Sequence, residues 1–317
     1  MVMRIYIEAK PTGGLTPWAH TYLVFRDSSV VRGSEADKAS RWIGGHPSVA
    51  ELSGPLETKE AQFGPLSGAN SMPKDWYGTG IGNSTVEQRS FLDITQIVVN
   101  ALGGSGTVEQ AWNMLKAAAD GIDGQYRYEL PLWSSAYTPD CNAVMFSVLN
   151  AVGVDARTIF PLLNEQNQFS SFPGGEGDIP VESSVVPGAG VNYPTLLATS
   201  SSATIEASSN LFAGVAVLGR HGVDDIMIGT SFRDAFYGEQ ALFGGIPDYL
   251  NTNDTVDYSR STGGLNVSLR FTDTAGVPGL IDPLKIFGVN MPSTLADDLY
   301  GVERVKLSAQ SDDVSGI

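Results

Sequence analysis

The feature of this 317-residue sequence that most restricts its fold is a short internal repeat in the C-terminal third. Asp225-Ile-Met-Ile-Gly229 and Asp234-Ala-Phe-Tyr-Gly238 share the form Asp-x-x-x-Gly, and the second copy follows the first by nine residues. The middle position of each copy is apolar, Met227 in one and Phe236 in the other. A short fixed period predicts stacked turns of chain, with the apolar position in the core and glycine at the tight bends.

This repeat resembles the calcium-binding nonapeptides of RTX proteins, which are secreted bacterial proteins of the hemolysin type. The resemblance covers about residues 212–305 and includes a later element, Asp298-Leu-Tyr-Gly-Val-Glu303. It implies a short β-roll, or β-solenoid, in which aspartate carboxylates bind structural Ca²⁺. The implied metal ligands are Asp225, Asp234, Asp248 and Asp254.

The repeat is degenerate, because His221, Thr230 and Phe232 stand where the RTX pattern has glycine. Neighbouring turns need close backbone approach at those positions, so we expect at most about two calcium ions. Aspartate also bends and caps turns without any ligand. A short β-solenoid that binds no metal is therefore the alternative.

Charge and hydropathy restrict the partners. The chain has 19 Lys and Arg against 35 Asp and Glu, a formal net charge of −16, so we expect no nucleic-acid partner. The acidity fits calcium affinity, or simply solubility. We expect no membrane span, and no N-terminal signal peptide, because Glu8 and Lys10 interrupt the region that would have to be apolar. The RTX resemblance implies export by a type I secretion apparatus to the extracellular medium.

The single cysteine lies at the start of a predicted helix. Asp140 is a suitable N-cap, an apolar run follows Cys141, and Gly153 comes just past the expected end. A helix N-terminus favours the thiolate form of a cysteine, and His20, which opens a predicted strand, could act as its base. Cys141 also falls on an apolar stripe with Val144, so a plain core cysteine is the alternative.

Three segments together resemble the circularly permuted papain-like thiol hydrolases, related to NlpC-type peptidases and lecithin:retinol acyltransferase. They are Ala19-His20-Thr-Tyr-Leu-Val-Phe25, Tyr126-Arg-Tyr-Glu-Leu130, and the Asp140–Gly153 helix. In that family the histidine strand precedes the cysteine helix. The resemblance covers about residues 1–165 and implies helices packed on an antiparallel sheet. It makes Cys141 the nucleophile and His20 the general acid and base.

The family also has a polar residue, on the strand after the histidine, that orients the imidazole. The matching position holds Arg32 in a predicted strand at 30–32, and a cation cannot accept the imidazole N–H. Either another group, such as Glu35, Asp37 or a backbone carbonyl, takes this role, or the site is inactive. His46 and His221 lie in glycine-rich turns, and we assign them no role.

Local patterns complete the expected architecture, which is α+β. We predict strands at 3–9 and 20–25, and loop with at most short elements over 44–82. Capping boxes at Ser84 and Thr107 each predict a helix, the first running through Phe91 and Ile94 to Leu102. We expect a papain-like domain at 1–171, a Gly/Pro/Ser-rich linker at 172–211 and a β-roll region at 212–317.

These features favour a secreted cysteine hydrolase or acyltransferase that acts on an amide or ester through a thioester at Cys141. The first alternative is a catalytically inactive, secreted calcium-binding or adhesive protein that keeps the papain-like fold. A second is a structural protein of a phage or cell surface.

Overall fold

In a computed structural model, the chain forms two compact units. Unit 1 comprises Met1–Trp133 and Thr138–Gly177, and unit 2 comprises Ser134–Tyr137 and Asp178–Ile317. The residues that the structure describes are 2–11, 19–47, 55–62, 90–128, 139–160, 162–163, 195–199, 203–207, 214–220, 222–232, 234–238, 253–269, 287–290, 296–300 and 302–316.

Unit 1 is built on an antiparallel sheet with strand order β6-β3-β2-β1-β7. Its strands are β1 (Met3–Pro11), β2 (Ala19–Asp27), β3 (Arg41–Ile43), β6 (Ala61–Gln62) and β7 (Ser90–Asp93). A small second sheet pairs β4 (His46–Pro47) with β5 (Leu56–Glu57), and a 3-10 helix, η1, covers Glu35–Ala39. The long β1–β2 pair runs in register from Met3↔Asp27 to Pro11↔Ala19, which confirms the two predicted strands.

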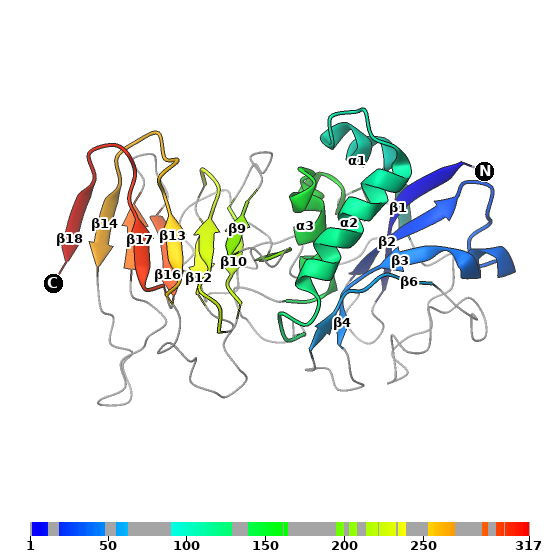
Figure 1. Cartoon of the computed structure of the whole chain (residues 1–317), viewed down its shortest axis with the longest axis horizontal. Coiled ribbons are helices and arrows are strands. Elements are labelled where there is room, and N and C mark those ends of the chain that lie inside the picture. The colour runs from blue at the N-terminus through cyan, green and yellow to red at the C-terminus, as the bar shows by residue number, and fades with distance from the viewer. Residues whose placement is uncertain are drawn as a thin grey trace. The chain divides into compact units, whose positions relative to one another are not determined.

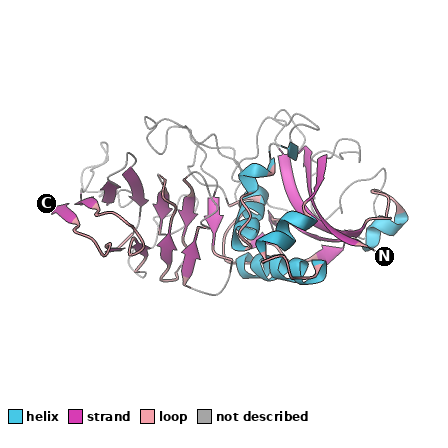
Figure 2. Ribbon diagram, turned by 90° about the horizontal axis from the view of Figure 1, so that it is seen from above, coloured by secondary structure: helices cyan, strands magenta, loops and turns pink. Residues whose placement is uncertain are grey.

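The helices of unit 1 are α1 (Thr95–Ala101), α2 (Val108–Ile122) and α3 (Cys141–Ala151), followed by the 3-10 helix η4 (Ala156–Thr158). The side of β2 that carries Thr21 and Phe25 faces helices α2 and α3 (Figure 2). There Phe25 stacks on Trp112 of α2, with ring centroids 5.2 Å apart. The predicted capping box of α2 is present, with Thr107 and Gln110 bonding each other's backbone N–H.

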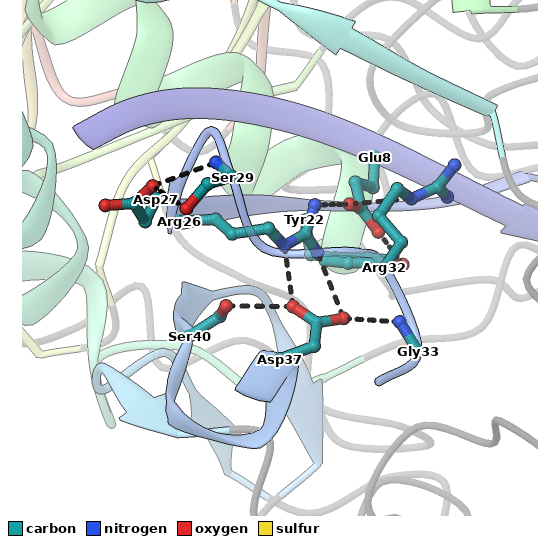
Figure 3. Close-up of polar contacts among 9 residues, drawn as sticks. All are labelled: Glu8, Tyr22, Arg26, Asp27, Ser29, Arg32, Gly33, Asp37 and Ser40. Carbon is teal, nitrogen blue, oxygen red and sulfur yellow. Dashed lines mark hydrogen bonds and ion pairs between the residues drawn. The ribbon is translucent and has the colours of Figure 1, made fainter. Parts of the chain in front are cut away.

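The opposite side of the sheet carries aromatic side chains and buried charges. Tyr22, Val24 and Trp42 form an apolar cluster there, consistent with the alternation of side chains along a strand. Next to this cluster, Arg26 bridges the carboxylates of Glu8 and Asp37 (Figure 3). The sheet is therefore buried on both sides.

Two local predictions for unit 1 were wrong. Residues 30–32 form turns, and the third strand of the meander is β3 at Arg41–Ile43. The helix predicted from Ser84 begins only at Thr95, because Ser90–Asp93 pairs with β1 as strand β7. Of the segment 126–130, whose residues alternate like a strand, the structure describes residues 126–128, where Arg127 forms an isolated bridge with Pro55.

Unit 2 consists of short strands in two sheets, visible as two rows in Figure 2, and from Thr195 to Asp257 successive strands alternate between the sheets. One sheet has the order β18-β14-β15-β16-β12-β10-β8 and the other β17-β13-β11-β9. Their bounds are β8 (Thr195–Leu197), β9 (Thr204–Glu206), β10 (Ala216–Leu218), β11 (Ile226–Ile228), β12 (Ala235–Tyr237), β13 (Thr255–Asp257), β14 (Asn266–Leu269), β15 (Phe287–Asn290), β16 (Ala296–Tyr300), β17 (Arg304–Lys306) and β18 (Asp313–Gly316).

The nine-residue repeat corresponds to a step from one of these sheets to the other. The first copy forms β11 and the second forms β12, each pairing in parallel with strands of its own sheet. Met227 and Phe236 are both fully buried, as the repeat predicts. The chain as a whole is thus α+β, with an antiparallel sheet in unit 1 and largely parallel pairing in unit 2.

The segment predicted as a linker contains two of the strands of unit 2. β8 and β9 lie within residues 172–211 and pair in parallel with β10 and β11. Strands of three residues show too little alternation to be recognised, and the Ser-rich stretch between them resembles a linker in composition. Within the described ranges, no helix is long and apolar enough to cross a membrane.

Candidate active site at the start of helix α3

Helix α3 begins as the sequence predicts, with Asp140 as its N-cap. The Asp140 carboxylate accepts hydrogen bonds from the backbone N–H groups of Asn142, at 2.9 Å, and Ala143, at 3.0 Å. These bonds satisfy two of the N–H groups that a helix start leaves without partners. Gly153 follows the helix with φ of 78°, the left-handed conformation that glycine adopts most readily. Cys141 therefore lies in the first turn.

The side chain of Asn142 holds this first turn against β2 on both sides of His20. Its carbonyl oxygen accepts from the backbone N–H of Thr21 at 3.2 Å and from the Thr21 hydroxyl at 2.7 Å. Its amide nitrogen donates to the carbonyl of Ala19 at 2.9 Å. One side-chain amide thus makes the pair of bonds that a neighbouring strand would make. Sequence analysis did not single out Asn142, although its place next to the only cysteine was a usable signal.

Gly45 lets a second segment approach the same turn. A Cβ atom at this position would lie 2.7 Å from Cγ2 of Val144 and 3.0 Å from Cα of Cys141. Such distances exclude any side chain unless the helix moves. The chain leaves β3 at Ile43, passes the helix at Gly45, and enters β4 at His46. The first turn of α3 therefore lies between β2 and the segment that carries His46.

His20 is buried, with 4% of its surface exposed, on the side of β2 that also carries Tyr22. The two rings have centroids 6.3 Å apart, and Lys10 is the register partner of His20 on β1. Burial lowers the pKa of His20 well below its ordinary value, and the charges of Lys10 and His46 lower it further. The imidazole is therefore neutral near pH 7 and a weaker base than an exposed histidine.

Cys141 is also buried, with 3% of its surface exposed. Burial raises the pKa of the thiol well above its ordinary value, and the Asp140 carboxylate raises it further. The backbone N–H groups of Thr21, Asn142 and Cys141 itself act in the opposite direction but do not overcome burial. The expectation that the helix N-terminus lowers the pKa of this thiol was therefore wrong, because desolvation outweighs the helix dipole.

The Cys141 thiol interacts with the backbone of β2. The N–H of Thr21 acts on the thiol, and a strand N–H points along the sheet and not out of either face. The His20 ring and the Thr21 hydroxyl lie on opposite faces, since the first neighbours Tyr22 and the second contacts α3. The thiol is thus near the Thr21 N–H, and the His20 ring lies on the other face of β2 from the Thr21 hydroxyl that contacts α3.

Arg32 does not occupy the position expected for a residue that orients His20. Its Nε atom lies 3.4 Å from Glu8 Oε1, and its guanidinium lies 4.3 Å from the centre of the Phe91 ring. Glu8 also accepts from the Tyr22 hydroxyl at 2.8 Å (Figure 3). The interpretation of Arg32 depended on a strand at 30–32 that is not present. The next strands after β2 are β3 and β4, and β4 begins with His46.

The Asp37 carboxylate forms its contacts with groups other than His20. Its carboxylate lies 2.6 Å from Arg26 Nε and accepts from the Gly33 backbone N–H and the Ser40 hydroxyl, each at 2.8 Å (Figure 3). Glu35 belongs to the same 3-10 helix. His46, which lowers the pKa of His20, begins β4, and sequence reasoning gave it no role. The preceding pair Gly44-Gly45 was the available signal, because paired glycines permit close packing.

Three of the four predicted calcium ligands lie in unit 2 as buried carboxylates that accept hydrogen bonds. Asp234 accepts from the backbone N–H of Val215, and Asp254 accepts from that of Asp225, both at 2.8 Å. Asp225 itself contacts the guanidinium of Arg220. Asp248 lies outside the described residues. Among the residues that are described, no group of three or more His, Cys, Asp or Glu side chains is arranged to hold a metal ion.

Calcium at these aspartates stays a prediction, because an ion would have to compete with the hydrogen bonds that occupy the same oxygens. No protein-family model matches the chain, and no curated protein or solved structure shows significant similarity to it.

Proposed function

We propose that unit 1 is a papain-like thiol hydrolase or acyltransferase, with Cys141 as the nucleophile and His20 as the general acid and base. The observation that supports the proposal is the position of Cys141 in the first turn of α3, which Asn142 joins to the backbone on either side of His20. A nucleophile and base from different elements, fixed by a third group, are the usual elements of such a site.

His46 is proposed as the group that orients His20. A neutral imidazole has one N–H donor and one acceptor, so two neutral rings can bond each other while His20 keeps a nitrogen for the thiol. His46 is close enough to affect the pKa of His20, and the Gly45 contact fixes the His46 segment against α3. His46 would then supply the orienting hydrogen bond that Arg32, as a cation, cannot accept from His20.

The pKa directions favour a neutral resting pair over a thiolate and imidazolium pair. The thiol pKa is raised and that of His20 is lowered, so the proton stays on sulfur until the substrate binds. His20 then accepts this proton as the sulfur attacks the acyl carbon and the C–S bond forms. The C–N or C–O bond breaks, and the leaving group takes the proton from His20. Water, or an acceptor amine or alcohol, then attacks the thioester and restores the thiol.

Acylation by p-nitrophenyl acetate tests this proposal without knowledge of the natural substrate. We expect a burst of p-nitrophenol equal to the amount of protein, and one acetyl group on Cys141 by peptide mass spectrometry. C141A should lose both. H20A and H46A should acylate at least about tenfold more slowly, since general base catalysis contributes on that order or more. The matched control is H221A, in which a histidine of unit 2 is replaced and the burst is retained.

The second candidate is a catalytically inactive binding or adhesive protein that keeps the papain-like fold, with unit 2 as a β-roll. The burial of Cys141 and its raised thiol pKa favour it, because an inert core cysteine has both properties. Acetylation that is absent, or equal in the wild type and C141A, would select this candidate. Secretion by a type I apparatus is proposed for either case, on the RTX resemblance alone.

A further inference from the structure

The carboxylates of unit 2 form a regular pattern that extends through both sheets. Asp225, Asp254 and Glu303 each directly precede a strand and are register equivalents, as the pairs Ile226↔Thr255 and Thr255↔Arg304 establish. Glu303 accepts from the backbone N–H of Asp254, and Asp254 accepts from that of Asp225, each at 2.8 Å. Asp254 and Glu303 therefore each bind the main chain of the equivalent acid on the neighbouring strand.

The other sheet repeats the pattern. Asp234 precedes β12 and is equivalent to Val215 on one side and Asp297 on the other. Asp234 accepts from the Val215 N–H, and Asp297 accepts from the Asp234 N–H, each at 2.8 Å. The second oxygen of Asp297 accepts from the Tyr258 hydroxyl at 2.8 Å. We call these five acids, Asp225, Asp234, Asp254, Asp297 and Glu303, the carboxylate ladder.

The turns that precede Asp225 and Asp234 supply further hydrogen-bond donors to these two carboxylates. Arg220 is 3% exposed, and its Nη2 and Nε atoms lie 2.6 Å and 3.1 Å from Oδ1 of the fully buried Asp225. The Arg220 backbone N–H donates to Oδ2 of the same carboxylate. In the next turn, Thr230 donates to Asp234 through its backbone N–H at 2.7 Å and through its hydroxyl at 2.9 Å. Both oxygens of Asp225 and of Asp234 thus have partners within the chain.

We infer that unit 2 folds without bound calcium, because Arg220 and the main-chain donors of the carboxylate ladder occupy the oxygens that would otherwise bind the ion. Thr230 is one of the residues that replace a repeat glycine, and it acts here as a donor to Asp234. A buried guanidinium paired with Asp225 balances its charge in the way a bound cation would. The inference is independent of the function proposed for Cys141.

Hydrogen exchange measured by mass spectrometry on the full chain tests this inference at the N–H groups of the ladder. We expect peptides that contain Val215, Asp225 and Asp234 to be equally protected in EDTA and in millimolar CaCl₂. Peptides that exchange at unprotected rates in EDTA and become protected when calcium is added would overturn the inference.

A substitution at Arg220 tests its role as the internal cation. R220M leaves Asp225 buried without its counter-charge, so exchange in the peptide that contains Asp225 should rise at least about tenfold in EDTA. The matched control is R304M, because Arg304 is exposed and contacts Asn253 at 3.0 Å without a buried acid. Equal exchange in the two variants would refute the role of Arg220.

A double variant separates loss of the counter-charge from a general failure to fold. R220M/D225N removes both charges, so it should recover most of the protection that R220M loses. Tryptophan fluorescence should report unchanged unfolding of unit 1 in all variants, because all five tryptophans belong to unit 1. R220M/D225N that is as unprotected as R220M would contradict the charge argument.

Discussion

The carbonyl oxygen of the Asn142 side chain lies 2.7 Å from the hydroxyl and 3.2 Å from the backbone nitrogen of Thr21, a residue 121 positions earlier in the chain. This contact, with the bond from Asn142 to Ala19, joins the start of α3 to the start of β2. It occupies backbone groups of β2 beyond the last pair with β3, at Leu23↔Ile43. One asparagine therefore joins the first turn of α3, which carries Cys141, to the backbone on either side of His20.

Replacing Asn142 by alanine should destabilise unit 1 by about 2–3 kcal/mol, because the buried Thr21 N–H and Ala19 carbonyl lose their partner. Urea unfolding followed by tryptophan fluorescence measures this loss. The matched control is N100A on α1, where the exposed Asn100 side chain accepts a hydrogen bond from the Gln96 side chain at 2.6 Å. Equal midpoints for N142A and N100A would show that Asn142 does not join α3 to β2.

The helix around Cys141 could be predicted from sequence because its signals are local. Asp140 and Gly153 mark its two ends, and the capping box at Thr107 marks α2 in the same way. The position of His46 could not be predicted, since it depends on where the chain goes after β3. That path is set by the packing of Gly45 on Val144, a contact between residues far apart in sequence.

The electrostatics of the site also depend on tertiary structure. A helix N-terminus alone predicts a lowered thiol pKa, but the pKa of Cys141 is raised by burial that the sequence does not specify. In unit 2, the repeat predicted the buried positions Met227 and Phe236. It did not predict Arg220 as the partner of Asp225, because that pairing depends on the conformation of a turn with a degenerate sequence.

Alkylation of Cys141 should depend on pH in the way that a raised thiol pKa requires. At pH 7 the thiol is protonated, so iodoacetamide should react about tenfold or more slowly than with free glutathione. The rate should continue to rise at pH values where glutathione is already fully ionised. The measurement is the alkylated fraction by mass spectrometry over time, from pH 6 to pH 10. A rate that levels off below pH 8 would mean that the thiol ionises readily, contrary to its burial.

Gly45→Ala should destabilise unit 1 by about 1–3 kcal/mol, because the added methyl group would lie 2.7 Å from Val144 Cγ2 and overpack the start of α3. Thermal unfolding followed by tryptophan fluorescence measures the effect. G106A is the matched control, since a Cβ there would be 3.7 Å from its nearest neighbour, Gln110 Oε1. The double variant G45A/V144A should recover part of the loss by making room for the methyl group. A loss that is no smaller in G45A/V144A would place the clash elsewhere.

We expect Arg26 to stabilise unit 1 mainly through its ion pairs with Glu8 and Asp37. Its Nη1 lies 2.9 Å from Glu8 and its Nε 2.6 Å from Asp37, and all three side chains are buried. R26M leaves two buried carboxylates without this counter-charge, so we expect a loss of about 3–5 kcal/mol in urea unfolding. R4M should cost much less, because the Arg4 ion pair with Asp93 is exposed and 3.8 Å long.

The same variant tests whether the charge network supports the candidate site. Glu8 bonds the Tyr22 hydroxyl, and the Tyr22 ring neighbours His20, so disorder caused by R26M should spread along this face of the sheet. Under conditions where R26M is still folded, we expect acetylation of Cys141 by p-nitrophenyl acetate to slow, while R4M keeps the wild-type rate. If folded R26M acetylates as fast as R4M, the network stabilises the sheet without positioning His20.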